Sequence, residues 1–266
     1  MKITILGAGT DASNLPGIEN RFPPGYFVEL GTENILFECS EGVRFRLEQM
    51  GQDYTAIKHL AISHSHPDHY VLVPFYQSIH NNLNWSGRYD EPHLLNIYAP
   101  KNITREFWDM WRMHHPNFPE GLKTPKLNFI TMPSECRVGD AKLSGFSVYH
   151  GKGLVPAVAY RLEAGGKVFA YSGDSGICDG VIEAARNADV FICETSAGID
   201  DEKSGTVYGH LNPRQAGEVA KSAGAKQIVF VHYTGLDSDE AMIEDCKVSG
   251  FTGKVVVGKD FQVFEI

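Results

Sequence analysis

The chain has 266 residues, of which 42% are hydrophobic and 21% charged, an ordinary composition for a globular protein. This length fits one large α/β domain, and we expect a single domain over residues 1–266. The formal net charge of −9 disfavours a broad nucleic-acid-binding surface, although it leaves room for a local basic patch. No apolar stretch approaches the roughly 20 residues that span a bilayer, so we expect no membrane partner.

The N-terminus and the cysteines bear on the compartment. Residues 1–7 have a strand-like pattern and are too short for a signal peptide. The five cysteines are scattered, odd in number and without a C-x-x-C pair, which argues against a disulfide framework. A reducing, cytoplasmic location is therefore expected.

The pattern of apolar residues alternates short strands with helices. Strands are predicted at residues 2–6, 25–30, 35–38, 57–62, 95–98, 127–131, 142–149, 157–162, 167–171, 190–193, 227–231, 254–257 and 261–264. Helices are predicted at residues 41–50, 104–113, 180–187 and 238–246, and from Pro213 onward. The helix at Pro213 has a capping residue, Asn212, followed by proline in its first turn. This alternation is typical of an α/β fold.

Residues 63–69, with the sequence SHSHPDH, place three imidazoles and a carboxylate directly after an apolar run. Alternate residues of an extended segment point the same way, so His64 and His66 can face one site. Asp68 and His69 follow in the turn after Pro67 and can reach a second, adjacent site. Imidazole and carboxylate ligands suit zinc, manganese or iron, so this loop predicts a metal centre.

The second half of the chain repeatedly places a polar residue at the end of an apolar strand. His150, Asp174 and His232 each follow such a strand, and His210 lies between the last two. An α/β scaffold assembles sites from strand ends in this way. Each residue alone also has a structural interpretation: a packed imidazole, a turn carboxylate or a histidine bonded to the backbone. Together with the first loop they favour one shared site.

With these residues in hand, the chain resembles the metallo-β-lactamase superfamily, and within it most closely the tRNase Z and phosphodiesterase branch. The resemblance runs from the MKITILGAGT opening to His232-Tyr233-Thr234, and H-x-H-x-D-H is that superfamily's metal motif. It implies a four-layer αββα sandwich of the α/β class. It also implies one metal on His64, His66 and His150, and a second on Asp68, His69 and His232. Asp174 would bridge the two ions.

The same resemblance suggests catalytic roles for three residues. His210 resembles the branch's histidine near the scissile group, and Glu194 resembles its carboxylate partner. Asp68 would help to orient a metal-bridging hydroxide. His210 would stabilise the developing charge or protonate the leaving oxygen, a task suited to imidazole.

Departures from neighbouring branches narrow the function. Asp174 and His69 argue against the commonest zinc β-lactamases, and His66 argues against the flavodiiron proteins. His150-Gly151 is not the H-T-P-G-H of glyoxalase II-like thioesterases. Many bacterial tRNase Z chains insert a long arm that grips tRNA between the third and fourth motifs. Here residues 161–167 predict only a hairpin.

The expected protein is therefore a dinuclear metal-dependent hydrolase holding two divalent ions, zinc first, with manganese or iron as alternatives. Its expected substrate is a small phosphodiester or a related ester. The alternative is a tRNA 3′-processing endoribonuclease acting on RNA. A non-catalytic metal-binding protein and an arylsulfatase-type hydrolase are less favoured.

Residues 108–118 are rich in Trp, Met, His and Pro. Helical spacing favours aromatics that complete the core. The functional alternative is a lid or a dimer contact, and we expect a homodimer. His59, His80, His93, His114 and His115 lack the strand-end placement of the others and are interpreted as structural or surface residues.

Overall fold

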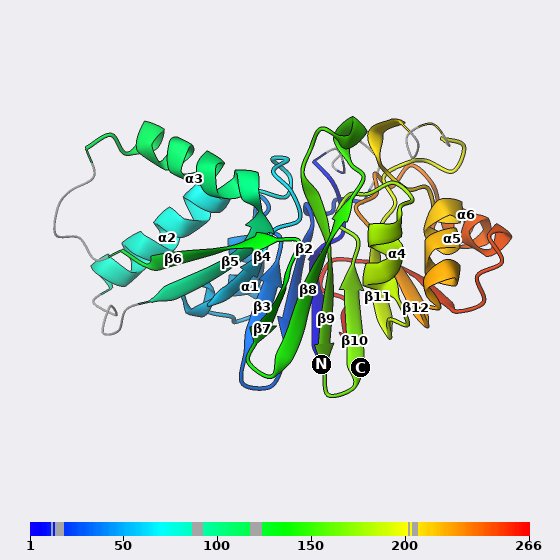
Figure 1. The fold of residues 1–266 in the computed structure, drawn as a ribbon, viewed down its shortest axis with the longest axis horizontal. Helices are drawn as coiled ribbons and strands as arrows, with labels where there is room; N and C mark the ends of the chain where they lie inside the picture. The colour runs from blue at the N-terminus through cyan, green and yellow to red at the C-terminus, as the bar shows by residue number, and fades with distance from the viewer. Residues whose placement is uncertain (12, 14–18, 87–92, 118–123, 202, 204–206) are drawn as a thin grey trace.

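The computed structural model describes residues 1–11, 13, 19–86, 93–117, 124–201, 203 and 207–266. Two seven-stranded sheets pack face to face, with helices on the outer side of each (Figure 1). The first sheet has the order β14-β1-β2-β3-β4-β5-β6. Its strands are β14 Val263–Glu265, β1 Lys2–Gly7, β2 Gly25–Glu29, β3 Asn34–Phe37, β4 His59–Ala61, β5 Leu94–Pro100 and β6 Lys126–Met132.

The second sheet has the order β13-β12-β11-β10-β9-β8-β7. Its strands are β13 Lys254–Val257, β12 Gln227–Val231, β11 Val190–Glu194, β10 Lys167–Tyr171, β9 Ala157–Ala164, β8 Ala141–Val148 and β7 Glu135–Val138. The helices are α1 Val43–Gln49, α2 Leu72–Trp85 and α3 Lys101–His114 beside the first sheet, and α4 Asp179–Ala185, α5 Pro213–Ala223 and α6 Asp239–Val248 beside the second. Two short 3₁₀ turns, Tyr54–Ala56 and Gly151–Gly153, are also present.

Alternation along the strands of the first sheet divides its side chains between two cores. On β2, Tyr26 and Val28 join the core between the sheets, whereas Phe27 joins the core under α1, α2 and α3. On β3, Phe37 and Leu36 divide in the same way. Successive side chains of a strand point to opposite faces, so an apolar strand with no polar face is buried on both. The predicted four-layer αββα architecture is confirmed.

Most predicted elements are present, but α2 and β7 are missing from the prediction. Helix α2 begins at Leu72, its N-cap residue Val71 makes no side-chain capping bond, and Pro74 lies in its first turn. One face of α2 is buried by aliphatic and aromatic residues, among them Phe75, Tyr76 and Ile79. Residues of this type also favour strands, so the local sequence does not identify the helix.

The aromatic segment after residue 107 continues α3 as far as His114. One of its two tryptophans completes the core, as the core interpretation predicts. Trp111 is 8% exposed and its ring contacts Tyr76, Phe107 and His115. Trp108 is 38% exposed and lies outside this core. Residue 118, the end of the proposed lid segment, lies outside the described residues. Within the described part of the chain, no helix has the length and apolar character needed to cross a bilayer.

Candidate metal centre

The loop that joins β4 to α2 carries four of the predicted ligands. The amides of His69 and Tyr70 both donate to the His66 carbonyl, at 3.0 and 2.9 Å, and close a tight turn. The amide of Cys39 then donates to the carbonyl of His69 (3.0 Å). The loop also reaches the second sheet, because the Val158 amide donates to the Ser63 carbonyl (3.0 Å). The turn therefore lies where the two sheets meet.

The remaining predicted ligands come from the second sheet. His150, Asp174 and His232 lie in the segments that follow β8, β10 and β12. The amide of His232 donates to the Ala8 carbonyl (2.7 Å), which fixes the end of β12 against the end of β1. The chain turn before Asp174 requires Gly173, because a Cβ there would lie 2.8 Å from the Val158 carbonyl oxygen.

All seven predicted ligands lie together, in two groups that meet at Asp174. His64, His66 and His150 offer nitrogen atoms within 4.8 Å of one another and of an Asp174 oxygen. Asp68, His69 and His232 form a second group of the same kind.

The two oxygens of Asp174 face different groups. Oδ2 lies 3.8 Å from His64 Nε2 and 3.9 Å from His150 Nε2. Oδ1 lies 3.3 Å from His69 Nε2 and 3.5 Å from His232 Nδ1. A carboxylate placed between two imidazole groups in this way is suited to bridge two cations. The role of these residues as ligands stays a prediction.

Several buried polar atoms in this cluster have no hydrogen-bond partner among the described residues. They are His64 Nε2, His69 Nδ1, His232 Nδ1 and Asp174 Oδ1. His69 Nδ1 faces Glu38 Oε1 at 3.5 Å, and the other three face Asp174 or the imidazoles around it. Buried polar atoms are normally paired, so three exceptions in one place call for a missing partner. His64 Nε2 lies 3.8 Å from Asp174 Oδ2, and Asp174 Oδ1 lies 3.3 Å from His69 Nε2 and 3.5 Å from His232 Nδ1, all without hydrogen-bond geometry. Nitrogen and oxygen atoms that lie this close together without hydrogen bonds between them are suited to be the ligands of a metal ion.

The pKa shifts of several histidines in the cluster also favour the binding of a cation. Burial lowers the pKa of His64, His66 and His150, which keeps these imidazoles in the neutral form that binds metals. Burial also opposes the charged form of His232, but Asp174 and Asp68 outweigh it and raise its pKa to about 10. The carboxylates thus attract positive charge into this half of the site, and a divalent cation would supply it.

His210 lies beside the cluster with its own carboxylate partner. Its Nδ1 is 3.2 Å from Glu194 Oε1, 2.8 Å from Ser196 Oγ and 3.8 Å from Asp174 Oδ2. Glu194 is fully buried and also accepts hydrogen bonds from the amides of Ser175, Ser196 and Leu211. Burial opposes charge on His210, but Glu194 and Asp174 outweigh it and raise the pKa of His210 to about 9. The predicted pairing of His210 with Glu194 is present in the structure.

Glycine is required immediately before His210. Gly209 has a φ of +79°, and a Cβ there would lie 2.4 Å from the Tyr149 carbonyl oxygen and 2.7 Å from His150 Cα. The Gly209 carbonyl oxygen is 3.1 Å from His150 Nδ1. The same close contact therefore positions His150 and His210. After His210, the predicted cap is present: Asn212 accepts from the Gln215 amide (2.8 Å) and starts α5.

Two residues at this site are absent from the sequence prediction. Glu38, fully buried at the end of β3, accepts from the Ser63 amide (3.2 Å), and its Oε1 is 3.5 Å from His69 Nδ1. Glu38 and His232 both have a positive φ, 67° and 54°, which costs about 1–3 kcal/mol and is typical of functional sites. A carboxylate directly after a buried strand is a sequence signal that could have identified Glu38. Ser196 gives no comparable signal.

The cluster opens into a cleft of about 260 Å³. Its walls include Asp68, Asp174, His210 and His232, and the glycine-rich loop after β1 contributes Thr10. Four of the candidate ligands, His66, Asp68, Asp174 and His232, therefore face one solvent-connected space together with His210. That space can admit part of a substrate beside the cluster.

Comparisons with known proteins identify the family. Residues 33–233 match the β-lactamase superfamily domain. The ribonuclease Z of Methanosarcina mazei is 27% identical, over 100% of this chain and 98% of that protein. The metallo-β-lactamase fold protein YhfI from Bacillus subtilis superimposes with a TM-score of 0.77 at 22% identity, over 99% of both chains. The short form of human tRNase Z gives a TM-score of 0.75 at 20% identity, over 100% of this chain and 99% of that one. The expected resemblance is confirmed: the chain belongs to the β-lactamase superfamily and is one of its metal-dependent hydrolases.

Proposed function

We propose that this protein is a metal-dependent phosphodiester hydrolase that processes RNA, in the manner of a ribonuclease Z. The observation that carries the proposal is Asp174, whose two oxygens face two separate groups of imidazoles beside His210. The M. mazei relative named ribonuclease Z, which matches along its whole length, favours RNA over a small ester. This reverses the order of the two substrates expected from the sequence.

The described residues include donors that would suit two ions. His64, His66 and His150 would hold one, Asp68, His69 and His232 the other, and Asp174 would be shared. Neutral imidazoles with carboxylates favour zinc, with manganese or iron as alternatives. When bound, such ions act as Lewis acids and activate water for attack on phosphorus.

The chain's own contribution to the chemistry centres on His210. The Ser196 hydroxyl donates to Glu194 Oε2 (2.9 Å), so its oxygen is free to accept from His210 Nδ1. Nδ1 therefore carries a proton directed toward Ser196 and Glu194. Against the effect of burial, the carboxylates of Glu194 and Asp174 raise the pKa of His210 to about 9, which favours a proton on the second ring nitrogen, Nε2, as well. His210 can then donate from Nε2 to the leaving oxygen or to a charged phosphoryl oxygen.

A small phosphodiester is the second candidate substrate, and one observation favours it. Strand β9 ends at Ala164 and β10 begins at Lys167, so only a two-residue turn lies where many bacterial tRNase Z chains carry their arm. Without that arm, and with a net charge of −9, RNA binding must depend on another surface.

The test is turnover by metal-replete protein, with metal content measured on the same sample. The substrates are a precursor tRNA with a 3′ trailer, bis(p-nitrophenyl) phosphate, cyclic nucleotides and an aryl sulfate. Cleavage of the precursor at the trailer with the highest kcat/KM supports the proposal. Turnover of only the small diesters favours the second candidate. Protein that holds its metals and turns over none of these substrates refutes the hydrolase mechanism.

A further inference from the structure

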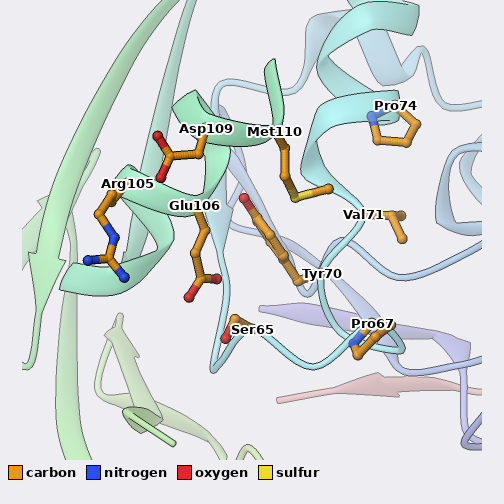
Figure 2. Close-up of a pocket in the computed structure, with 9 residues that line it drawn as sticks. All are labelled: Ser65, Pro67, Tyr70, Val71, Pro74, Arg105, Glu106, Asp109 and Met110. Atoms are coloured by element: carbon orange, nitrogen blue, oxygen red, sulfur yellow. The ribbon is translucent and has the colours of Figure 1, made fainter. Parts of the chain in front are cut away.

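A second cavity, of about 510 Å³, lies beside the metal cluster (Figure 2). It is an open cavity bounded by the loop after β4, the start of α2 and the side of α3. Pro67 lines both this cavity and the cleft that contains Asp68 and His210. The two cavities therefore adjoin at Pro67.

The cavity combines an apolar lining with polar groups on the α3 side. Pro67, Tyr70 and Met110 supply apolar surface, and Ser65, Arg105 and Glu106 supply polar atoms. Tyr70 is buried, with 6% of its surface exposed, and its hydroxyl has no hydrogen-bond partner among the described residues. Figure 2 shows that hydroxyl directed toward α3, near Glu106 and Met110. An apolar cavity with a few polar groups suits a planar ligand with a hydrogen-bonding edge.

The wall between this cavity and the metal loop is fixed by Asn102, at the start of α3. Its side-chain amide donates to Ser65 Oγ (3.2 Å) and to Glu106 Oε1 (3.0 Å). Ser65 lies between His64 and His66, so α3 is bonded directly to the loop that carries the candidate ligands. The cavity therefore keeps a set position relative to the metal cluster.

Helix α3 also presents cations beside the cavity. Lys101, Arg105, Trp108 and Arg112 are exposed and follow the spacing of one helical face. Arg112 pairs with Asp109 (2.7 Å), whereas Lys101 and Arg105 make no ion pair with any described residue. Unpaired cations with an exposed tryptophan are a combination that binds single-stranded nucleic acid. Glu106 and Asp109 also line the cavity, and Asp109 is taken up by Arg112, so Lys101 and Arg105 are the cations on α3 that remain available to RNA in a chain of net charge −9.

We propose that this cavity binds the base of an unpaired nucleotide next to the scissile phosphate, and that Arg105 and Lys101 on α3 hold the phosphates that follow it. The inference rests on the proposed RNA-processing function. The base would pack against Tyr70, Met110 and Pro67, with its polar edge toward Glu106 and Arg105. Helix α3 would then serve in place of the absent arm.

The first test uses the wild-type protein and changes only the RNA. Single abasic sites are placed in turn at each unpaired position flanking the cleavage site, and KM and kcat are measured. Base stacking of about 1–3 kcal/mol corresponds to a loss in kcat/KM of about 5- to 150-fold at one position. In Met110→Trp, whose larger side chain would occupy part of the cavity, the difference between the intact and abasic RNA should shrink. Equal kcat/KM for all abasic positions in the wild type would overturn the base-binding cavity.

The second test compares Arg105→Ala with Arg137→Ala. Arg137 is also exposed and lies on β7 of the other sheet, where it bonds only the nearby Asp140 carbonyl among the described residues. In Arg105→Ala the ratio of kcat/KM for RNA to that for bis(p-nitrophenyl) phosphate should fall about fivefold, the scale of one exposed charge contact. The slope of log affinity against log salt should fall by about 0.7 for the lost phosphate contact. Arg137→Ala should match the wild type in both.

The outcomes separate the two proposals. If the wild type cleaves RNA while Arg105→Ala and Arg137→Ala give the same salt slope, the role of α3 is overturned and the RNA-processing function stands. If the wild type cleaves only small diesters, both proposals fail together. Circular dichroism and metal content of each variant show whether it folds and keeps its metal centre.

Discussion

Replacing Gly209 with alanine tests how closely the segment before His210 is packed against His150. Gly209 has a φ of +79°, which costs an L-residue about 1–2 kcal/mol. The new Cβ would also lie 2.4 Å from the Tyr149 carbonyl oxygen, and forcing an extra carbon into a packed site costs about 1–3 kcal/mol. Gly209→Ala should therefore lower the free energy of unfolding by about 2–5 kcal/mol.

Gly165→Ala is the matched control. Gly165 also has a positive φ (+57°), but nothing lies within 4 Å of the position that its Cβ would occupy. Gly165→Ala should therefore lower the free energy of unfolding only by the backbone cost of about 1–2 kcal/mol. The difference between the two variants then isolates the clash with Tyr149 and His150.

Denaturant unfolding of both metal-free variants measures that difference, and metal titration measures its consequence. Because a Cβ at Gly209 would also lie 2.7 Å from His150 Cα, the variant should bind metal more weakly at the His64, His66 and His150 group. Equal losses of stability in the two variants, with unchanged metal affinity, would refute the argument that glycine is required at position 209 for packing.

Three further predictions concern single side chains. His210→Ala should keep the fold and the metals yet lower kcat by about 10²–10⁴-fold on a substrate with a poor leaving group, and less with p-nitrophenolate; an unchanged kcat there would remove His210 from the mechanism. Asp174→Ala should lower metal content at both positions, since its oxygens face both groups, and loss of only one ion by elemental analysis would contradict the shared role. Trp111→Ala should cost about 3–5 kcal/mol in a denaturant melt without altering the kinetics of the folded fraction, whereas the exposed Trp108→Ala should cost much less.

The predicted ligands could be read from the sequence because each carries a local signal. Residues 63–69 concentrate their donors in one short loop, and His150, Asp174 and His232 each follow a recognisable apolar strand. Glu38 has the same strand-end placement, but its role depends on contacts with Ser63 and His69, which only the fold reveals. Ser196 joins the site through Glu194 and His210, again by contacts that no local pattern encodes.

The cavity beside α3 could not be predicted at all. It depends on α2, which the local sequence does not identify as a helix, and on the packing of α3 against the start of α2. The sequence also could not show which tryptophan after residue 107 is buried, because this too depends on how α3 packs against α2. Trp111 and Trp108 lie three residues apart on α3, yet one completes the core and the other faces outward.

The division of the cluster between the two sheets has a consequence for folding kinetics. The contact of His66 with His150 spans 84 residues, and that of Asp68 with His232 spans 164. Closing loops of this length is slow and must follow the formation of the local strands and helices. The complete set of donors therefore exists only after the sheets have docked. In a refolding experiment, the uptake of tightly bound metal should coincide with the final phase and would report when the chain has reached its native topology.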